Sequence, residues 1–238
     1  MAEGVIPPFV HSFDVGSQTV WLCPEGAEPS EDELAGALDP EEWALAAPIR
    51  APRRRREFLI GRWLHHLISG STEPLAKDDT GVPQWPQGFV GSISHKAGHV
   101  AYSFSRDQDL LGLGLDLEDV AQVKPSLAPR ICRAQELALL EDLSHDSETK
   151  QRCLALIFSF KEALFKAHYP HGRKFFYFGD AEVLKIDLIE RTMVARLLVD
   201  TTPATLSGHK VQGAFMEWPH QERHFVLTAI VERKLGTT

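Results

Sequence analysis

The sequence predicts a globular α+β protein in which one order of elements occurs twice. Of its 238 residues, 43% are hydrophobic and 24% are charged, a balance that excludes disordered, collagen-like and membrane-spanning chains. Blocks of helical and of alternating hydrophobic periodicity follow one another along the chain. Each half contains a strand, a short helix, a long helix and a run of strands. This order suggests a duplicated unit joined near residues 115–125, with an N-terminal half over 1–115 and a C-terminal half over 116–238.

In the first half, a strand is expected at residues 19–22, followed by a loop rich in Pro, Gly and Glu. Asp39 is expected to cap a helix, because Pro40 and two acidic residues follow it. A longer helix is predicted at residues 53–69, with Gly70 ending it. Strands are then expected at residues 90–94, 99–105 and 111–118.

In the second half, the periodicity predicts helices at residues 133–143 and 148–168, and Pro170 is expected to stop the second of them. The strands expected after it cover residues 175–178, 181–189, 193–199, 211–218 and 225–231.

The charges are distributed unevenly. Residues 1–49 contain ten acidic residues and no Lys or Arg, which leaves 25 basic and 23 acidic residues in the rest of the chain. The run Arg53 to Arg56 follows directly. Basic charge concentrated at one place suits a small polyanion better than a nucleic acid, so we expect no nucleic-acid partner.

The cysteines and the N-terminal residues indicate the cellular compartment of the protein. The three cysteines (Cys23, Cys132 and Cys153) lie far apart without paired spacing, which favours a reducing compartment. No segment combines a basic start with an apolar run, and no stretch approaches the roughly 18 apolar residues of a membrane span. The sequence therefore predicts a cytoplasmic protein without a membrane span.

Residues 111–118, LGLGLDLE, form the strongest local pattern. In a strand, Gly112, Gly114, Asp116 and Glu118 share one face and the leucines share the other. Two adjacent carboxylates repel each other unless a cation lies between them, and oxygen ligands of this kind suit Mg²⁺. The alternative is a strand edge with two solvated acids. The glycines argue against it, because they leave room for something close to the backbone.

A second pattern lies in residues 158–166, FSFKEALFK. In a helix, Phe158, Glu162 and Lys166 are successive i, i+4 neighbours. The simplest interpretation is a solvated Glu–Lys pair. Because the helix is apolar over much of its surface, Glu162 is more plausibly half-buried and in need of a partner.

The third pattern is a rigid turn followed by a strand of small residues that ends in Ser94, His95 and Lys96. These residues could donate hydrogen bonds to an anion. Two alternatives remain open: a structural histidine, and a serine nucleophile with His95 as its base. Neighbours in a strand point to opposite faces, which argues against the nucleophile.

The fourth pattern is a cluster of four arginines on one helix: Arg54, Arg55, Arg56 and Arg62. Arg54 and Arg62 lie eight residues apart, hence within about 80° of each other around the helix axis. They could clamp a terminal phosphate, or form a solvated basic face that balances the acidic arm. The pair His65 and His66 has no metal-ligand spacing and is expected to be structural.

Four blocks together resemble the 4'-phosphopantetheinyl transferases of the surfactin and enterobactin type, in order and in spacing. The blocks are RRREFLIGR at 54–62, WPQGFVGSISH at 85–95, GLDLE at 114–118 and FSFKEALFK at 158–166. The resemblance implies two similar α+β halves related by a pseudo-twofold axis, with coenzyme A bound in the cleft between them. Many surfactin-type members have Trp where Phe158 stands, and enterobactin-type members often have Arg or a larger polar residue near Val82.

The resemblance also implies roles for single residues. Asp116, Glu118 and Glu162 correspond to Mg²⁺ ligands, with Mn²⁺ as a substitute metal. Lys166 and Lys161 correspond to the lysines beside the pyrophosphate, and Ser94 and His95 to further phosphate contacts. Arg54, Arg62 and Lys77 correspond to contacts with the nucleotide and its 3'-phosphate. Catalysis is assigned to Glu162, Lys166 and His95.

The implied reaction transfers the 4'-phosphopantetheine arm of coenzyme A to a serine of an apo acyl or peptidyl carrier protein and releases 3',5'-ADP. Mg²⁺ and cationic side chains would stabilise the charge that develops on the phosphates. Glu162, or a metal-bound water that it orients, is the expected base for the serine hydroxyl. A monomer is expected, serving polyketide, peptide, fatty-acid or siderophore synthesis. The alternatives are a Mg²⁺-dependent phosphohydrolase that acts on coenzyme A or a nucleotide, and a carrier-binding module without activity.

Overall fold

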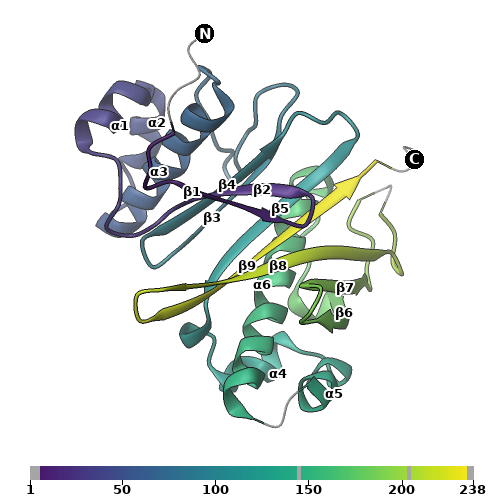
Figure 1. Cartoon of the computed structure of the whole chain (residues 1–238). Coiled ribbons are helices and arrows are strands. Elements are labelled where there is room, and N and C mark those ends of the chain that lie inside the picture. Colours follow the sequence, from purple (N-terminus) through teal and green to yellow (C-terminus); the bar gives the residue numbers. More distant parts are fainter. Residues whose placement is uncertain (1–5, 144–145, 203–204, 235–238) are drawn as a thin grey trace. The chain divides into compact units, whose positions relative to one another are not determined.

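The computed structural model describes residues 6–143, 146–202 and 205–234 (Figure 1). The chain forms two compact units. Unit 1 comprises Met1–Asp14 and Thr19–Gln108, and unit 2 comprises Val15–Gln18 and Asp109–Thr238. The expected boundary between residues 115 and 116 falls inside strand β5 (Leu110–Asp119), which lies wholly in unit 2.

Unit 1 contains a four-stranded sheet in the order β1-β2-β4-β3. Its strands are β1 (His11–Val15), β2 (Gln18–Cys23), β3 (Val90–Lys96) and β4 (His99–Ser105). The antiparallel hairpin of β3 and β4 turns at Ala97 and Gly98, both at positive φ (52° and 88°). A two-residue turn with this geometry matches the right-handed twist of the strands. It fixes the register that places His95 opposite Val100.

Three helices complete unit 1: α1 (Glu31–Ala37), α2 (Pro40–Ala46) and α3 (Pro52–Ser69). Asp39 caps α2 as predicted, in a capping box with Glu42, and Gly70 ends α3 in the left-handed conformation. The core of the unit joins α3 to β4 through residues that include Ile60, Leu64, Val100 and Tyr102. Helix α1 and strand β1 were not expected from the sequence.

Unit 2 contains a five-stranded sheet in the order β5-β9-β8-β7-β6. The strands after β5 are β6 (Ala181–Asp187), β7 (Thr192–Leu197), β8 (Lys210–His220) and β9 (Arg223–Arg233). The ladder between β5 and β9 is long and runs from Leu110↔Arg233 to Asp119↔Phe225.

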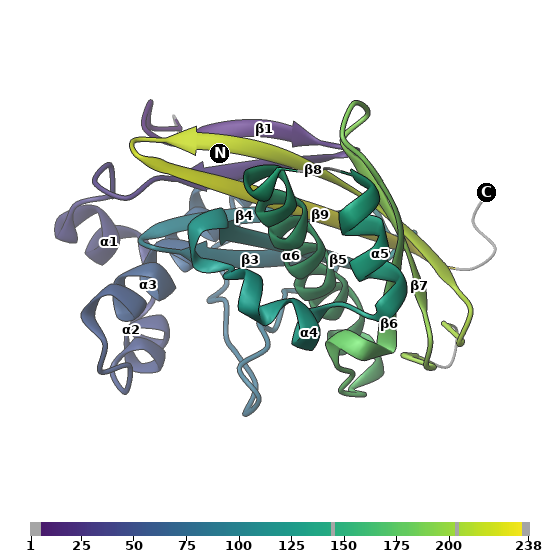
Figure 2. The same cartoon turned by 90° about the horizontal axis from the view of Figure 1, so that it is seen from below.

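The helices of unit 2 are α4 (Ala128–Ile131), α5 (Ala134–Leu143) and α6 (Ser147–Gly172), with short 3₁₀ turns η1 (Val120–Gln122), η2 (Pro125–Leu127) and η3 (Phe178–Asp180). Helix α6 packs on β5 and β9, as Figure 2 shows. Its Phe160 is fully buried, in a core with Val226 and Ile230 of β9.

Two local expectations in unit 2 were wrong. Pro170 does not stop α6, which continues to Gly172 and ends where Arg173 adopts the left-handed conformation. A proline this close to a helix end removes only one backbone hydrogen bond, and packing can tolerate that loss. The strand expected at residues 175–178 is irregular chain followed by η3, because its aromatic side chains pack on α6 instead, for example Phe165 with Phe176.

The mixed helix and sheet content confirms the predicted α+β class.

Cys23, Cys132 and Cys153 are free and buried. Among the helices in the described ranges, none is long and apolar enough to cross a membrane.

Candidate active site

In unit 2, Asp116 and Glu118 lie on one face of β5, and each is only 6% exposed. The alternative of two solvated acids at a strand edge is therefore wrong. Helix α6 packs against the same face and brings Glu162 and Lys166 to it. Lys166 Nζ lies 2.7 Å from Asp116 Oδ1 and 3.0 Å from the carbonyl oxygen of Leu115.

The glycines of β5 explain how a helix approaches a strand so closely. A Cβ atom on Gly112 would overlap the carbonyl oxygen of Ala167, and one on Gly114 would overlap that of Ala163. The space that these glycines leave is filled by the backbone of α6. Gly112 and Gly114 therefore bring the acids of the strand and the charged residues of the helix together.

Replacing Gly114 by Ala is expected to push α6 away from β5, because the clash involves backbone atoms that cannot rotate aside. Overpacking of this kind costs about 1–3 kcal/mol or more, which chemical unfolding measures as a lower midpoint. Gly179→Ala in the same unit is the control, because a Cβ there meets nothing within 4 Å. Equal stability of both variants would mean that the close packing does not constrain the helix.

The acids and Lys166 interact electrostatically. Burial raises the pKa of the Glu162 carboxyl, the negative charge of Asp116 raises it further, and Glu118 adds a smaller contribution, while Lys166 lowers it. Glu118 Oε1 accepts a hydrogen bond from the Asp119 amide at 2.9 Å. With the side chains as they lie, no three or more His, Cys, Asp or Glu residues within the described ranges could together hold a metal ion.

Lys161 does not belong to this group, contrary to the expectation that placed it beside the pyrophosphate. Its side chain is 2% exposed, and Nζ donates to Glu136 Oε2 (2.8 Å) and to the carbonyl oxygens of Ile131 (2.8 Å) and Phe178 (2.9 Å). All three donors of the ammonium are satisfied inside unit 2. Lys161 thus ties α6 to the segments around α4 and η3.

In unit 1, α3 carries a stripe of Arg54, Phe58 and Arg62. The Arg62 guanidinium lies 3.5 Å from the centroid of the Phe58 ring, and Lys77 Nζ lies 5.3 Å from the same centroid. Arg62 is 5% exposed, and its Nε has no hydrogen-bond partner among the described residues. Burial lowers the pKa of the Arg62 guanidinium, the negative charge of Glu42 offsets part of this, and the positive charge of Arg54 adds to the lowering, so that the pKa is about 10. Such a group would gain from an anion.

His95 approaches α3 from β3. Its Nδ1 lies 2.9 Å from Glu57 Oε2, and its side chain is 29% exposed. Ser94, its neighbour in the strand, is buried on the opposite face of the sheet. The structure therefore does not bring these two side chains together. The sequence analysis did not identify Glu57 as a candidate site residue. The only signal was an acidic residue within an otherwise basic helix.

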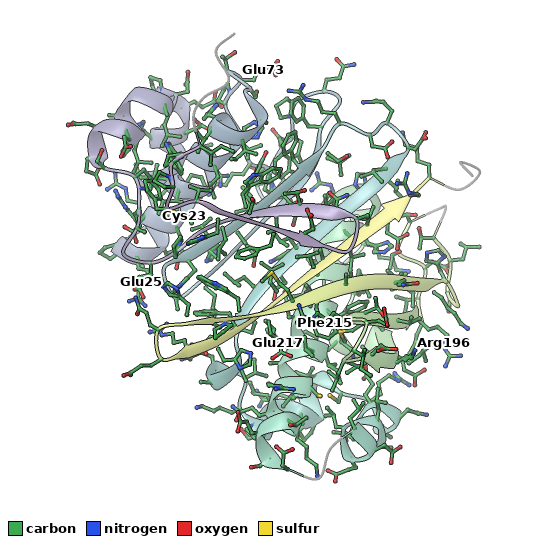
Figure 3. All side chains as sticks on the ribbon, in the orientation of Figure 1. Cys23, Glu25, Glu73, Arg196, Phe215 and Glu217 are labelled. Atoms are coloured by element: carbon green, nitrogen blue, oxygen red, sulfur yellow. The ribbon has the colours of Figure 1, made fainter. Side chains whose placement is uncertain are left out.

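Two other arginines near the start of α3, Arg53 and Arg56, pair with the acidic arm. Arg53 lies 3.2 Å from Glu25, which Figure 3 labels, and Arg56 lies 3.1 Å from Glu28 and also contacts Glu31. For Arg56, the alternative of a basic face that balances the acidic arm was the correct one.

Comparison with known proteins decides the family. A 4'-phosphopantetheinyl transferase superfamily model matches residues 112–223, and a model of the N-terminal domain of these transferases matches residues 44–102. The 4'-phosphopantetheinyl transferase PptT of Mycobacterium tuberculosis is 31% identical over 81% of this chain and 85% of its own length. The chain belongs to the 4'-phosphopantetheinyl transferase superfamily. The transferase is also 30% identical to Svp of Streptomyces mobaraensis, over 91% of this chain and 88% of that protein.

The family models together span both groups of residues described above. Asp116, Glu118, Glu162 and Lys166 lie within the match in unit 2, and Arg54, Arg62, Lys77 and His95 lie within the match in unit 1. The resemblance noted from the four sequence blocks is thus confirmed at the level of the superfamily. His65 and His66 of the transferase are structural, as expected: they contact the Tyr102 hydroxyl and Glu42, respectively.

Proposed function

We propose that this transferase moves the 4'-phosphopantetheine arm of coenzyme A to the serine hydroxyl of an apo acyl or peptidyl carrier protein. The observation that best supports this function is the close packing of α6 on β5, which gathers three carboxylates and the Lys166 ammonium on one face of unit 2. Negative charge develops on the phosphates in this reaction, and positive groups stabilise it.

We propose Asp116, Glu118 and Glu162 as the residues that hold Mg²⁺. Their side chains must turn toward one another to do so, because as they lie no three ligands within the described ranges converge. Their donor type suits the ion, because Mg²⁺ prefers carboxylate oxygens. Their charges also suit it, since the negative charges of Asp116 and Glu118 raise the pKa of the Glu162 carboxyl, and a cation among the three carboxylates would offset this repulsion. When bound, the ion would neutralise pyrophosphate charge.

The protein's own residues account for the other steps. The serine oxygen of the carrier bonds to the β-phosphorus of coenzyme A, the bond from that phosphorus to the bridging oxygen breaks, and 3',5'-ADP leaves with the electron pair. The serine proton passes to the Glu162 carboxylate. Lys166 stabilises charge on the phosphoryl oxygens.

In unit 1 we propose that Arg54, Arg62, Lys77 and His95 contact the nucleotide and its 3'-phosphate. Ser94 is not included, because it is buried on the opposite face of its strand. The buried guanidinium of Arg62 supports this role most strongly, because its Nε has no partner in the described part of the chain. We further propose a cytoplasmic location, which the three free cysteines support. The monomeric state and the pathway served stay predictions.

The decisive experiment is mass spectrometry of an apo carrier protein incubated with the transferase, coenzyme A and Mg²⁺. A mass gain of one phosphopantetheine arm is expected. Coenzyme A incubated without a carrier tests the rival phosphohydrolase, which would release 3',5'-ADP in that control. No mass gain on any acyl or peptidyl carrier would contradict the proposal.

Arg62→Ala is expected to raise the KM for coenzyme A roughly tenfold to a hundredfold, since a charge-assisted hydrogen bond is worth about 1.5–3 kcal/mol. The effect on kcat should be smaller, because the 3'-phosphate is bound alike in the ground state and the transition state. With 3'-dephospho-coenzyme A the same substitution should matter little. Equal losses with both donors would show that Arg62 acts through folding instead.

A further inference from the structure

The side chain of Glu57 has two specific contacts, and each uses a different carboxylate oxygen. Oε2 lies 2.9 Å from Nδ1 of His95, and Oε1 accepts a hydrogen bond of 2.9 Å from the amide of Gly98. Gly98 belongs to the β3–β4 turn and His95 to β3. Because each oxygen of the carboxylate has its own partner, the group cannot rotate freely. Glu57 itself is 5% exposed and lies on α3.

This arrangement determines which nitrogen of His95 carries a proton. A carboxylate only accepts hydrogen bonds, so Nδ1 must be the donor. In a neutral ring, Nε2 then has a lone pair, which would repel a phosphate. Only the imidazolium form, with both nitrogens protonated, can donate from Nε2 to an anion while it remains bonded to Glu57.

The Glu57 carboxyl carries a negative charge beside the His95 ring. Burial raises the pKa of the Glu57 carboxyl, but the hydrogen bonds from His95 and Gly98 lower it by more. The pKa is therefore below its usual value. The carboxylate is therefore ionised and lies against the ring. Among the described residues, Nε2 of His95 makes no other hydrogen bond, and 29% of the side chain is exposed.

We propose that Glu57 is a positioning residue, which orients the His95 ring through Nδ1 and stabilises the imidazolium that forms when Nε2 donates to the 3'-phosphate of coenzyme A. This inference rests on the proposed function, in which His95 contacts that phosphate. Glu57 does not touch the substrate itself. It acts through the orientation and charge of His95, in the way that carboxylates orient and charge catalytic or metal-binding histidines in other sites.

The test compares Glu57→Gln, His95→Gln and the double variant, with steady-state kinetics for coenzyme A and for 3'-dephospho-coenzyme A. Glutamine can still accept the Gly98 hydrogen bond, so the turn is retained while the charge is removed. We expect Glu57→Gln to raise the KM for coenzyme A on the order of tenfold, with little change in kcat or in the KM for the dephospho donor. In the His95→Gln background, Glu57→Gln should have no further effect.

The matched control is Glu232→Gln in unit 2, where Glu232 Oε2 lies 3.3 Å from Nε2 of His209. This substitution removes the charge of a comparable half-buried Glu–His pair, in which Glu232 also faces His168 at 3.7 Å, and should leave the KM for coenzyme A unchanged. A rise in KM that persists without His95, or that is equal for both donors, would overturn the inference and assign Glu57 a purely structural role. Failure of the wild-type protein to bind coenzyme A or 3',5'-ADP in calorimetry would instead overturn the proposed function, and the inference with it.

Discussion

Replacing Asp116 by Asn is expected to lower kcat/KM for carrier loading by at least about a hundredfold. The substitution keeps the shape of the side chain but removes the charge that pairs with Lys166 at 2.7 Å and acts on Glu162. The proposed metal site then lacks one of its three anionic ligands. Initial rates at limiting and saturating Mg²⁺ measure the effect, and circular dichroism checks the fold, because Asp116 is buried.

Asp187→Asn is a suitable control for this variant. It breaks another Asp–Lys pair of unit 2, in which Lys185 Nζ lies 2.9 Å from Asp187 Oδ2, and it should leave the rate unchanged. If Asp116→Asn kept nearly full activity at limiting Mg²⁺, the acids of β5 would have no part in the reaction. Glu162→Gln is expected to behave like Asp116→Asn.

The second large effect concerns stability. Lys161→Met is expected to lower the free energy of unfolding by about 3–5 kcal/mol, because it leaves Glu136 as a buried carboxylate without its cation. Glu136 is fully buried and also accepts hydrogen bonds from the amides of Arg133 and Val183. Urea unfolding gives the loss directly. Adding Glu136→Gln should recover part of it, since the unpaired charge disappears.

Lys150→Met on the same helix provides the comparison. Lys150 pairs with Glu141, whose side chain is 69% exposed, and such surface pairs contribute only about 0–1 kcal/mol. If Lys161→Met were as stable as the wild type but bound coenzyme A poorly, Lys161 would contact the pyrophosphate, as its place in the sequence motif first suggested.

The parts of the fold that the sequence predicted are those with local causes. Asp39 and Pro40 mark a helix start whatever surrounds them, and the alternation around Asp116 indicates a strand with two acids on one face. The pattern could not show what covers that face. The glycines indicated a close neighbour, but its identity as the backbone of α6 depends on residues some fifty positions away.

The residues that were misassigned or missed depend on long-range contacts. Lys161 and Lys166 look alike in a helical motif, yet one is enclosed by Glu136 and two carbonyl groups while the other reaches Asp116. The role of Glu57 can be recognised only in the folded structure, where β3 brings His95 next to α3. Residues 175–178 have strand-like composition, but their aromatic side chains find a better surface on α6.

The pairing of β5 with β9 has a consequence for how the protein is made. Strand β5 leaves the ribosome more than a hundred residues before β9, although the two form one ladder from Leu110↔Arg233 to Asp119↔Phe225. Contacts this distant in sequence form slowly and late. During synthesis, therefore, Asp116 and Glu118 cannot take their native places until residues 223–233 have emerged. A nascent chain stalled before β9 should be unable to modify any carrier. Activity should appear only after β9 has paired with β5 and β8.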